Sequence, residues 1–485
     1  MASRRIDGAL AGLGTPFPSI LECAHPCGAF GRQARRLNPS NRPSRRHSKI
    51  LERFLKLRPI APPNTENAIG ENAHRFVRAA HSYDNQKTSM RKNSILTLIA
   101  AGAAYLLVSQ ASAQVLDPWQ TVYEGSQTTP PSTRINDLAA DTSGAIVALE
   151  TVYDPTVGAQ DTALVMSADA GVSWVRRPVI LGRFDDVTLA SSGDLFLSGS
   201  QGVIMQSSDA GITWHTAWTT PGGGLDGDNA IHDLAAGSGG AVYAAAEIKP
   251  RWLLVKAVPE VGGMSWAIVD DYHPDSKTVY QHSSIAVRRG AGVGGADEIY
   301  VGGFQNHQRN GGSFLVRKSY DGGATWTTVM AYQIVAGAYM AVGVQQVAIA
   351  PDGTVYVAGR LPVSKTRTGK TTTLNHASLL RKSTDGGLTW TSLLQTPKHI
   401  QGLTVDLAGR VFLGLWDSQT ANSTVEVSAD EGVSWSVSDT TASTLDVPRL
   451  AVDSAGNVYS GGSVYQGGSD NTYSAYSVIR TLAAP

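Results

Sequence analysis

The chain has 485 residues, and its 40 lysine and arginine residues balance 40 aspartate and glutamate residues, so the formal net charge is zero. Residues 1–113 hold 17 basic and 6 acidic residues, whereas residues 114–485 hold 23 basic and 34 acidic ones. An acidic main part with scattered arginines argues against nucleic-acid binding, which needs basic residues gathered on one face. Both cysteines, Cys23 and Cys27, precede the main part, so core burial and not disulfide bonds must hold it together.

Residues 1–89 are rich in arginine and proline and show no sustained apolar periodicity. We interpret them as a disordered leader outside the fold that results from an error in the assigned gene start, with Met90 as the true first residue. The alternative is a long targeting extension. The spacing of Cys23 and Cys27 is a weak metal or redox signal, and we interpret it as accidental.

Residues 90–113 have the three parts of a signal peptide. Arg91 and Lys92 are followed by an apolar stretch over 95–108 and by the small residues of 111–113. The apolar stretch has about 14 residues, which is short for a membrane span of roughly 20. We therefore expect cleavage after Ala113 and a protein that is secreted or periplasmic. A single anchoring helix is the alternative.

A repeated motif decides the fold of residues 114–485. The pattern Ser-x-Asp-x-Gly-x-Ser/Thr-Trp occurs at residues 167–174, 207–214, 319–326, 383–390 and 428–435. A sixth copy ending at Trp266 keeps Gly263 but has Val261 in place of the aspartate. Aspartate and serine side chains bond turn amides, glycine accepts the positive φ of a tight turn, and tryptophan provides apolar surface for packing.

We expect the aspartates and tryptophans of these motifs to be structural. They are Asp169, Asp209, Asp321, Asp385 and Asp430, with Trp174, Trp214, Trp326, Trp390 and Trp435. Repeated aspartate and glycine also occur in calcium loops, but here the carboxylates are spaced one per unit, too far apart to share an ion. The sequence predicts no metal site and no cofactor.

Seven further segments lie between the motifs, and each reads as strand, glycine-containing turn and strand. They begin near Ile135, Phe184, Ile231, Ser283, Val342, Ile400 and Val447. A third strand follows each of these hairpins, and the motif then leads into a fourth strand that starts with its tryptophan. The chain is therefore a series of four-stranded units.

The two ends of the main part complete one unit together. Residues 476–482 resemble a third strand with no motif after it, and residues 119–123 resemble a tryptophan-led fourth strand with no motif before it. The predicted fold is all-β, a seven-bladed β-propeller over 114–485 whose N- and C-terminal strands pair. Such closure removes exposed sheet edges.

The motif and its repetition resemble the Asp-box (BNR) repeats of the sialidase-like β-propellers. The resemblance covers residues 119–485 and implies the fold but no particular chemistry, because the group includes sialidases, xyloglucan hydrolases, sortilin-type receptors and a photosystem II assembly factor. A single ring of seven blades is most similar to the assembly-factor type.

The candidate site is the face opposite the motif turns, where loops enter first strands and leave second strands. The candidate catalytic carboxylates there are Asp137, Asp186, Asp233 and Asp417. The candidate ligand-binding residues are Arg134, Arg183, His232, His282, Arg360, Trp416 and Arg449. Arginines bind carboxylates bidentately, and aromatic faces stack on sugar rings. The competing interpretation is that these residues cap turns and solvate the rim.

Two functions from different classes follow. We expect a secreted propeller, a monomer with no membrane span after signal cleavage, that recognises a glycan or protein ligand on its open face. The alternative is a glycoside hydrolase, sialidase-like or otherwise exo-acting, or a polysaccharide lyase, with acidic residues in the central pocket. An assembly scaffold is a third possibility. No complete catalytic constellation can be assembled from the sequence.

Overall fold

The computed structural model describes residues 119–125, 132–141, 143–154, 158–199, 201–221, 229–248, 251–273, 278–307, 311–333, 343–368, 371–441, 449–467 and 473–485. The predicted leader (1–89) and signal peptide (90–113) lie outside these residues. Among the described residues, no helix has the length and apolar character needed to cross a membrane.

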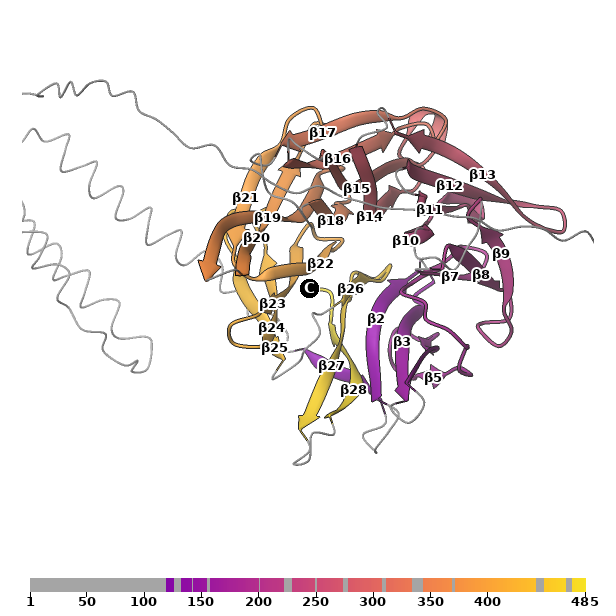
Figure 1. The fold of residues 1–485 in the computed structure, drawn as a ribbon. Coiled ribbons are helices and arrows are strands. Elements are labelled where there is room, and N and C mark those ends of the chain that lie inside the picture. Colours follow the sequence, from indigo (N-terminus) through magenta and orange to yellow (C-terminus); the bar gives the residue numbers. More distant parts are fainter. Residues whose placement is uncertain are drawn as a thin grey trace, which may run out of the picture. The chain divides into compact units, whose positions relative to one another are not determined.

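The described residues form seven four-stranded antiparallel sheets, which confirms the predicted all-β propeller. The sheets are arranged as blades around a central axis, with the first strand of each blade innermost (Figure 1).

The first three blades follow one another along the chain. Blade 1 contains β2 (Ser132–Ala140), β3 (Ile146–Asp154), β4 (Ala159–Ser167) and β5 (Val175–Arg176). Blade 2 contains β6 (Asp186–Leu189), β7 (Leu195–Ser198), β8 (Val203–Ser207) and β9 (His215–Thr219). Blade 3 contains β10 (Asn229–Ala236), β11 (Val242–Ile248), β12 (Arg251–Glu260) and β13 (Gly263–Tyr272), with a short 3₁₀ turn at Ser238–Gly240.

The remaining blades continue the series. Blade 4 contains β14 (Thr278–Arg288), β15 (Glu298–His307), β16 (Gly311–Ser319) and β17 (Thr327–Gln333), with a 3₁₀ turn at Val293–Gly295. Blade 5 contains β18 (Gly343–Ile349), β19 (Val355–Thr368), β20 (Thr371–Ser383) and β21 (Thr391–Thr396). Blade 6 contains β22 (His399–Val405), β23 (Val411–Asp417), β24 (Asn422–Ser428) and β25 (Ser436–Thr441). Blade 7 contains β26 (Arg449–Val452), β27 (Val458–Gly467), β28 (Tyr473–Leu482) and β1 (Gln120–Glu124).

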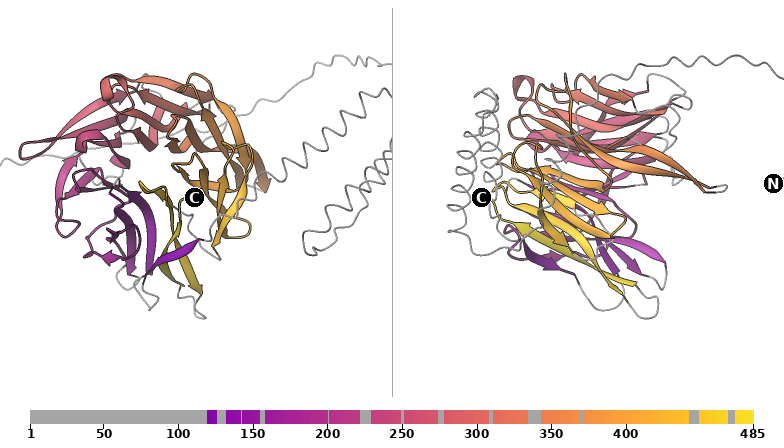
Figure 2. Two further views of the ribbon diagram at one scale, coloured as in Figure 1. Left: turned by 180° about the vertical axis from the view of Figure 1, so that it is seen from behind. Right: turned by 90° about the vertical axis from the view of Figure 1, so that its left-hand side faces the viewer.

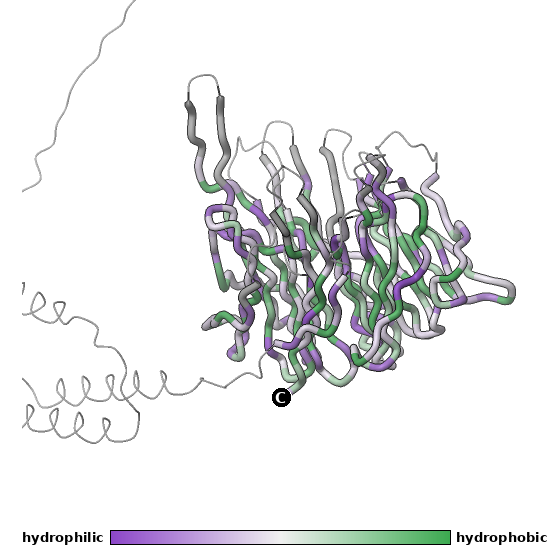
Figure 3. The backbone as a smooth tube through the Cα atoms, turned by 90° about the horizontal axis from the view of Figure 1, so that it is seen from below, coloured by the Kyte–Doolittle hydropathy of each residue, from purple (hydrophilic) through white to green (hydrophobic). Residues whose placement is uncertain are grey.

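The hydrophobic core consists of layers between neighbouring blades. Each cluster of buried side chains combines two adjacent sheets, for example Phe196 of blade 2 with Val242 of blade 3, and Ile135 of blade 1 with Ile479 of blade 7. Figure 3 shows the hydrophobic residues in green along the strands. Because both faces of most blades are covered in this way, the second and third strands read as continuous apolar runs.

The motif turns are built from their own side chains. In blade 1 the backbone N–H of Gly171 donates to Ser167 Oγ at 2.8 Å, and the N–H of Ser173 donates to Asp169 Oδ1 at 2.8 Å. Trp174 Nε1 donates to the Gly171 carbonyl at 3.1 Å, and its ring packs against the layer shared with blade 7. The motif residues therefore fold the turn locally and anchor its exit strand on the preceding blade.

The turn needs two consecutive residues with positive φ. Gly171 has a φ of 86°, and Ala170 before it has a φ of 54°. Blades 4 and 5 place glycine at the earlier position as well, at Gly322 and Gly386, where φ is 68° and 71°. Glycine adopts this conformation at little cost, whereas alanine is strained there. The two consecutive glycines of each of these motifs therefore allow the turn to form without backbone strain.

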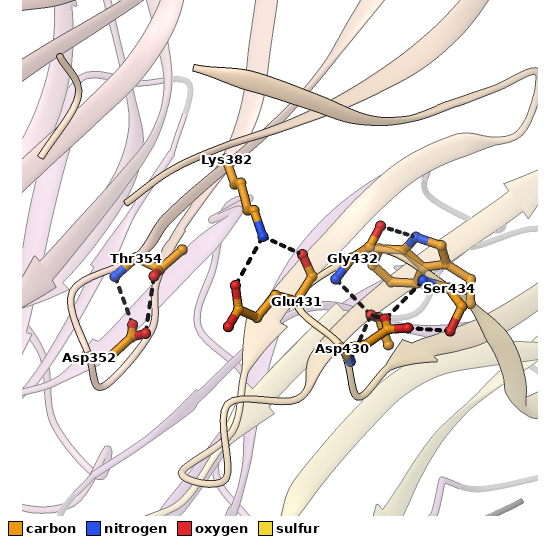
Figure 4. A network of polar contacts seen from close by, with 9 residues as sticks. Asp352, Thr354, Lys382, Asp430, Glu431, Gly432 and Ser434 are labelled. Atoms are coloured by element: carbon orange, nitrogen blue, oxygen red, sulfur yellow. Dashed lines mark hydrogen bonds and ion pairs between the residues drawn. The ribbon is translucent and has the colours of Figure 1, made fainter. Parts of the chain in front are cut away.

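Side chains of the preceding blade also hold the motif turns. Lys382 of β20 donates to the carbonyl of Glu431 at 3.2 Å and to its carboxylate at 3.0 Å (Figure 4). Lys318 and Tyr459 make the matching bonds to the carbonyls of Gly386 and Ala170, at 3.3 and 3.0 Å. One strand donor thus satisfies a turn carbonyl on the next blade and fixes the angle between the sheets.

Blade 3 departs from the pattern where the sequence lacks the aspartate. β12 and β13 join through a tight turn in which Val261 is fully exposed and Gly262 has a φ of 96°. Trp266 nevertheless packs where a motif tryptophan packs, beside Phe196 and Trp218 of blade 2. The tryptophan's packing role is thus kept without the motif turn.

The two ends of the described chain meet in blade 7. β1 pairs antiparallel with β28, with Gln120 opposite Thr481. Trp119 is buried at 7% exposure between blades 6 and 7, and its Nε1 donates to Ser438 Oγ at 2.8 Å. The predicted closure of the ring by its terminal strands is therefore confirmed.

The propeller has two different faces. The turns from first to second strands and the motif turns share one face, which we call the closed face. The opposite face, which we call the open face, is where the first strands begin and the second strands end. The long hairpin of β19 and β20 projects on that side beyond its neighbours (Figure 2).

Replacing Tyr459 by Phe is expected to destabilise the fold by about 1–2 kcal/mol. The substitution keeps the buried ring but removes the hydroxyl that bonds Ala170 and Asp453, both at 3.0 Å. Urea unfolding measures the change. Tyr153→Phe is the matched control, because that ring is 41% exposed, and it should have little effect. Equal stability of the two variants would contradict a role for the hydroxyl between blades.

Candidate functional site

β-Bulges interrupt the innermost strands at equivalent positions. The register of the first two strands shifts at Asn136, His232, Gln345 and Gln401 in blades 1, 3, 5 and 6. A bulge inserts one extra residue and re-aims the side chains beside it. Consecutive residues of one strand can therefore both face the channel.

These bulges surround a cavity of about 580 Å³ in the middle of the ring. Its lining takes a pair of consecutive residues from six of the seven blades: Asn136 with Asp137, Asp185 with Asp186, His232 with Asp233, Gln345 with Gln346, Gln401 with Gly402, and Arg449 with Leu450. Phe304, Gly343 and Val344 complete the described lining. The pairs lie near the beginnings of the first strands, so the cavity lies toward the open face.

Three carboxyl groups from consecutive blades form a row in this cavity. The carboxyl of Asp186 is in hydrogen-bonding contact with that of Asp137, and the carboxyl of Asp233 is in contact with that of Asp186. Asp186 is 7% exposed, and no N–H or O–H donor among the described residues reaches its Oδ2 atom. A proton shared between neighbouring carboxyls fills that gap.

Burial and mutual repulsion hold protons on this row. Burial raises the pKa of Asp233 to about 7. Burial, followed by the charges of Asp137 and Asp233, raises the pKa of Asp186 well above its usual range, and burial raises the pKa of Asp137. Two or three carboxylates in contact cannot all ionise, so at neutral pH the row presents O–H donors as well as acceptors.

The same carboxyls also connect the blades. The N–H of Val187 in blade 2 donates to Asp137 Oδ2 at 3.1 Å, and the N–H of Ile285 in blade 4 donates to Asp233 Oδ2 at 2.7 Å. Ser284 continues the series by accepting from the N–H of Val347 at 3.2 Å. Each of these side chains therefore joins its own first strand to that of the next blade.

The opposite side of the cavity carries amides and one cation. Gln345, Gln346 and Gln401 come from blades 5 and 6, and Arg449 of blade 7 donates to the Gln401 carbonyl at 3.3 Å. Gln345 Oε1 is buried and accepts no hydrogen bond from a described residue. This side of the cavity therefore has an unsatisfied hydrogen-bond acceptor, to which a hydroxyl group of a ligand can donate.

The remaining predicted ligand residues are distributed over several places. His232 lines the cavity, and its Nε2 lies 2.9 Å from the buried carboxylate of Glu247. Arg183 lies outside the lining and pairs with Asp185 at 2.7 Å. Arg134 is exposed and also outside the lining. The side chain of His282 lies outside the described residues.

Asp417 lies apart from the other three candidate carboxylates. It is a partly exposed residue at the end of β23, where it accepts the N–H of Gln419 at 2.9 Å. That turn bond, the largest influence, lowers the pKa of Asp417. Beside it in sequence, Trp416 belongs to a second group of side chains with His399 and Arg360.

Among the described residues, no group of three or more histidine, cysteine, aspartate or glutamate side chains is arranged to hold a metal ion. Most of the residues that line the cavity have hydrogen-bonding side chains. The cavity offers carboxyl O–H donors on one side and amide and guanidinium groups on the other, with Phe304 and Leu450 as apolar surface.

Comparison with known proteins gives similarity of fold. No protein-family model and no curated protein matches the chain. The solved structure of YCF48 bound to D1 peptide is 12% identical with a TM-score of 0.44, and the match covers 77% of this chain and 100% of that one. The polysaccharide lyase Uly1 is 9% identical with a TM-score of 0.48, covering 77% and 94%. The alpha-L-arabinanase of Penicillium chrysogenum with arabinobiose is 13% identical with a TM-score of 0.40, covering 76% and 98%.

Proposed function

We propose that this chain is a secreted Asp-box propeller that binds a saccharide in the cavity of its open face. The observation that carries the proposal is the ring of paired hydrogen-bonding side chains at the bulges of the first strands. Sugar hydroxyls donate and accept hydrogen bonds at once. The protonated carboxyls on one side of the cavity and the amides on the other offer both hydrogen-bond donors and hydrogen-bond acceptors.

The orphan oxygen of Gln345 supports this proposal. A buried acceptor without a donor costs free energy in the empty protein, and a ligand hydroxyl removes that cost. Secretion is proposed from the signal-peptide pattern of residues 90–113.

The arrangement of the carboxyls favours binding over hydrolysis. Glycosidases hold their two carboxyl groups about 5–9.5 Å apart, so that the scissile bond and, in inverting enzymes, a water fit between them. Asp137, Asp186 and Asp233 are instead in contact in a row, and two of them accept backbone N–H groups of the next blade. Carboxyl groups in hydrogen-bonding contact leave no gap of that size between them.

One observation favours a glycoside hydrolase as a second candidate. The pKa of Asp233, raised by burial to about 7, suits a general acid at neutral pH. In that case Asp233→Asn abolishes turnover of a bound saccharide while leaving binding in place. Product analysis of every saccharide that the protein binds tests this candidate directly.

Gln345→Ala is expected to weaken saccharide binding by about 2- to 10-fold, the effect of one hydrogen bond. A glycan array of neutral and acidic oligosaccharides identifies ligands of the full chain, and calorimetry then compares the variants. Gln395→Ala is the matched control, because Gln395 is exposed on β21 and should leave affinity unchanged. Binding of peptides but of no saccharide would overturn the proposal in favour of a protein ligand.

A further inference from the structure

Arg360 is a partly buried cation with no counter-ion among the residues that the structure describes. It lies on β19, opposite Gly343 of β18 and Ser378 of β20. The Nε atom of Arg360 is buried and donates to no described residue, and its guanidinium forms no ion pair with a described residue. Burial lowers the pKa of Arg360, but a guanidinium remains charged at any physiological pH. A desolvated charge of this kind is costly unless an anion joins it.

Further donors lie beside Arg360, on the neighbouring blade. The two blades are joined there by the N–H of Ile400, which donates to Ser378 Oγ at 3.0 Å. His399 lies next to Ile400 and contacts Trp416 edge-on, with ring centroids 5.2 Å apart. Trp416 Nε1 is buried and, like Arg360 Nε, has no acceptor among the described residues.

The neighbouring charges that act on His399 are positive. Burial lowers the pKa of His399, and the charges of Arg360 and then His376 lower it further. No carboxylate contributes to the pKa of either His399 or Arg360. The group therefore has donors and positive charge but no described anion, the reverse of the carboxyl row across the cavity.

The group adjoins the cavity through two of its lining residues. Gly343 lines the cavity and is the strand partner of Arg360. Gln401 also lines it and lies two residues after His399, about 7 Å along an extended strand. A ligand as long as two sugar units can therefore occupy the cavity and reach this group.

We propose that Arg360, His399 and Trp416 form a carboxylate-binding subsite of the open-face cavity, and that the ligand is an acidic saccharide containing uronic acid. This inference rests on the proposed saccharide binding. The planar guanidinium pairs with a carboxylate in a bidentate way, and the edges of the aromatic rings limit where the sugar can lie. The hydroxyl groups of the same ligand meet the amides and carboxyls of the cavity.

The test compares neutral oligosaccharides with their uronic-acid counterparts of the same linkage and length. Binding to the full chain is measured by calorimetry for the wild type, for Arg360→Gln and for Arg251→Gln. Arg251 is a matched control, because it is 41% exposed and paired with Asp271 in blade 3. The wild type is expected to bind a uronic-acid oligosaccharide at least about 10-fold more tightly than its neutral counterpart. This is the effect of one charge-assisted hydrogen bond.

Arg360→Gln is expected to abolish this preference while keeping the affinity for the neutral saccharide, and Arg251→Gln to keep both. Thermal unfolding of each variant separates a binding defect from a folding defect. Equal affinity for acidic and neutral saccharides in the wild type overturns the carboxylate subsite but leaves saccharide binding intact. Binding of acidic peptides in place of every saccharide overturns both this inference and the proposed function.

Discussion

Replacing Asp186 by Asn is expected to raise the free energy of unfolding at pH 8 and above while changing it little at pH 4. In the wild type the pKa values of Asp137, Asp186 and Asp233 are raised in the folded state, chiefly by burial. The folded protein therefore holds protons that the unfolded chain releases near pH 4. This contribution to stability is fully present below pH 4, falls by about 1.4 kcal/mol per pH unit for each proton between pH 4 and its raised pKa, and is lost above that pKa.

The asparagine removes the central charge of the row and keeps its geometry. Its oxygen still accepts the N–H of Leu234, and its amide can donate to the carboxylate of Asp137. Urea unfolding between pH 4 and pH 9 measures the effect. Asp417→Asn is the control, because Asp417 lies outside the cavity and keeps a turn-capping role as asparagine. Unchanged pH dependence in Asp186→Asn would contradict proton sharing along the row.

Replacing Trp119 by Ala is expected to cost about 3–5 kcal/mol, as other large-to-small substitutions in cores do. Trp119 fills the layer between blades 6 and 7, where it packs against Phe412 and Leu482. Its carbonyl also accepts a bond from Arg480 of β28 at 3.0 Å. The loss therefore falls on the one blade that is assembled from both ends of the described chain.

Trp119→Phe separates packing from hydrogen bonding. It keeps most of the apolar contact and loses only the bond to Ser438, so a cost of about 1 kcal/mol is expected. Unfolding in urea gives both values. Similar losses for the two variants would mean that the hydrogen bond, and not the packing of the ring, holds β1 in place.

The fold could be predicted from the sequence because the motif residues of a blade form its turn through local hydrogen bonds. The serine, aspartate and glycine of a motif build the turn within eight residues, as the bonds around Asp169 show. Closure was also predictable, since a tryptophan-led strand and a third strand were each left without a motif. The turn of blade 3 was harder to predict from the sequence. Its degenerate motif has Val261 in place of aspartate and forms a tighter turn.

The candidate site was predictable only in part. Asp137, Asp186 and Asp233 meet in the cavity because the apolar pattern already placed them on first strands. Gln346 and Gln401 were missed as site residues, because an amide in a strand carries no signal by itself. A polar pair interrupting an apolar first strand was the available signal, but only strand pairing reveals a bulge. Asp417 was misplaced because a strand end can face the channel or cap a turn.

The pairing of β1 with β28 has a consequence for how the protein is made. Trp119 and its partner Arg480 are 361 positions apart along the chain. A ribosome that adds about 5–20 residues per second needs roughly 20–70 s to travel from one to the other. During that time β1 has been made but β28 has not. The unpaired edge of β1 and the uncovered side chain of Trp119 can then contact other chains. The nascent chain is therefore exposed to aggregation until β28 has been made.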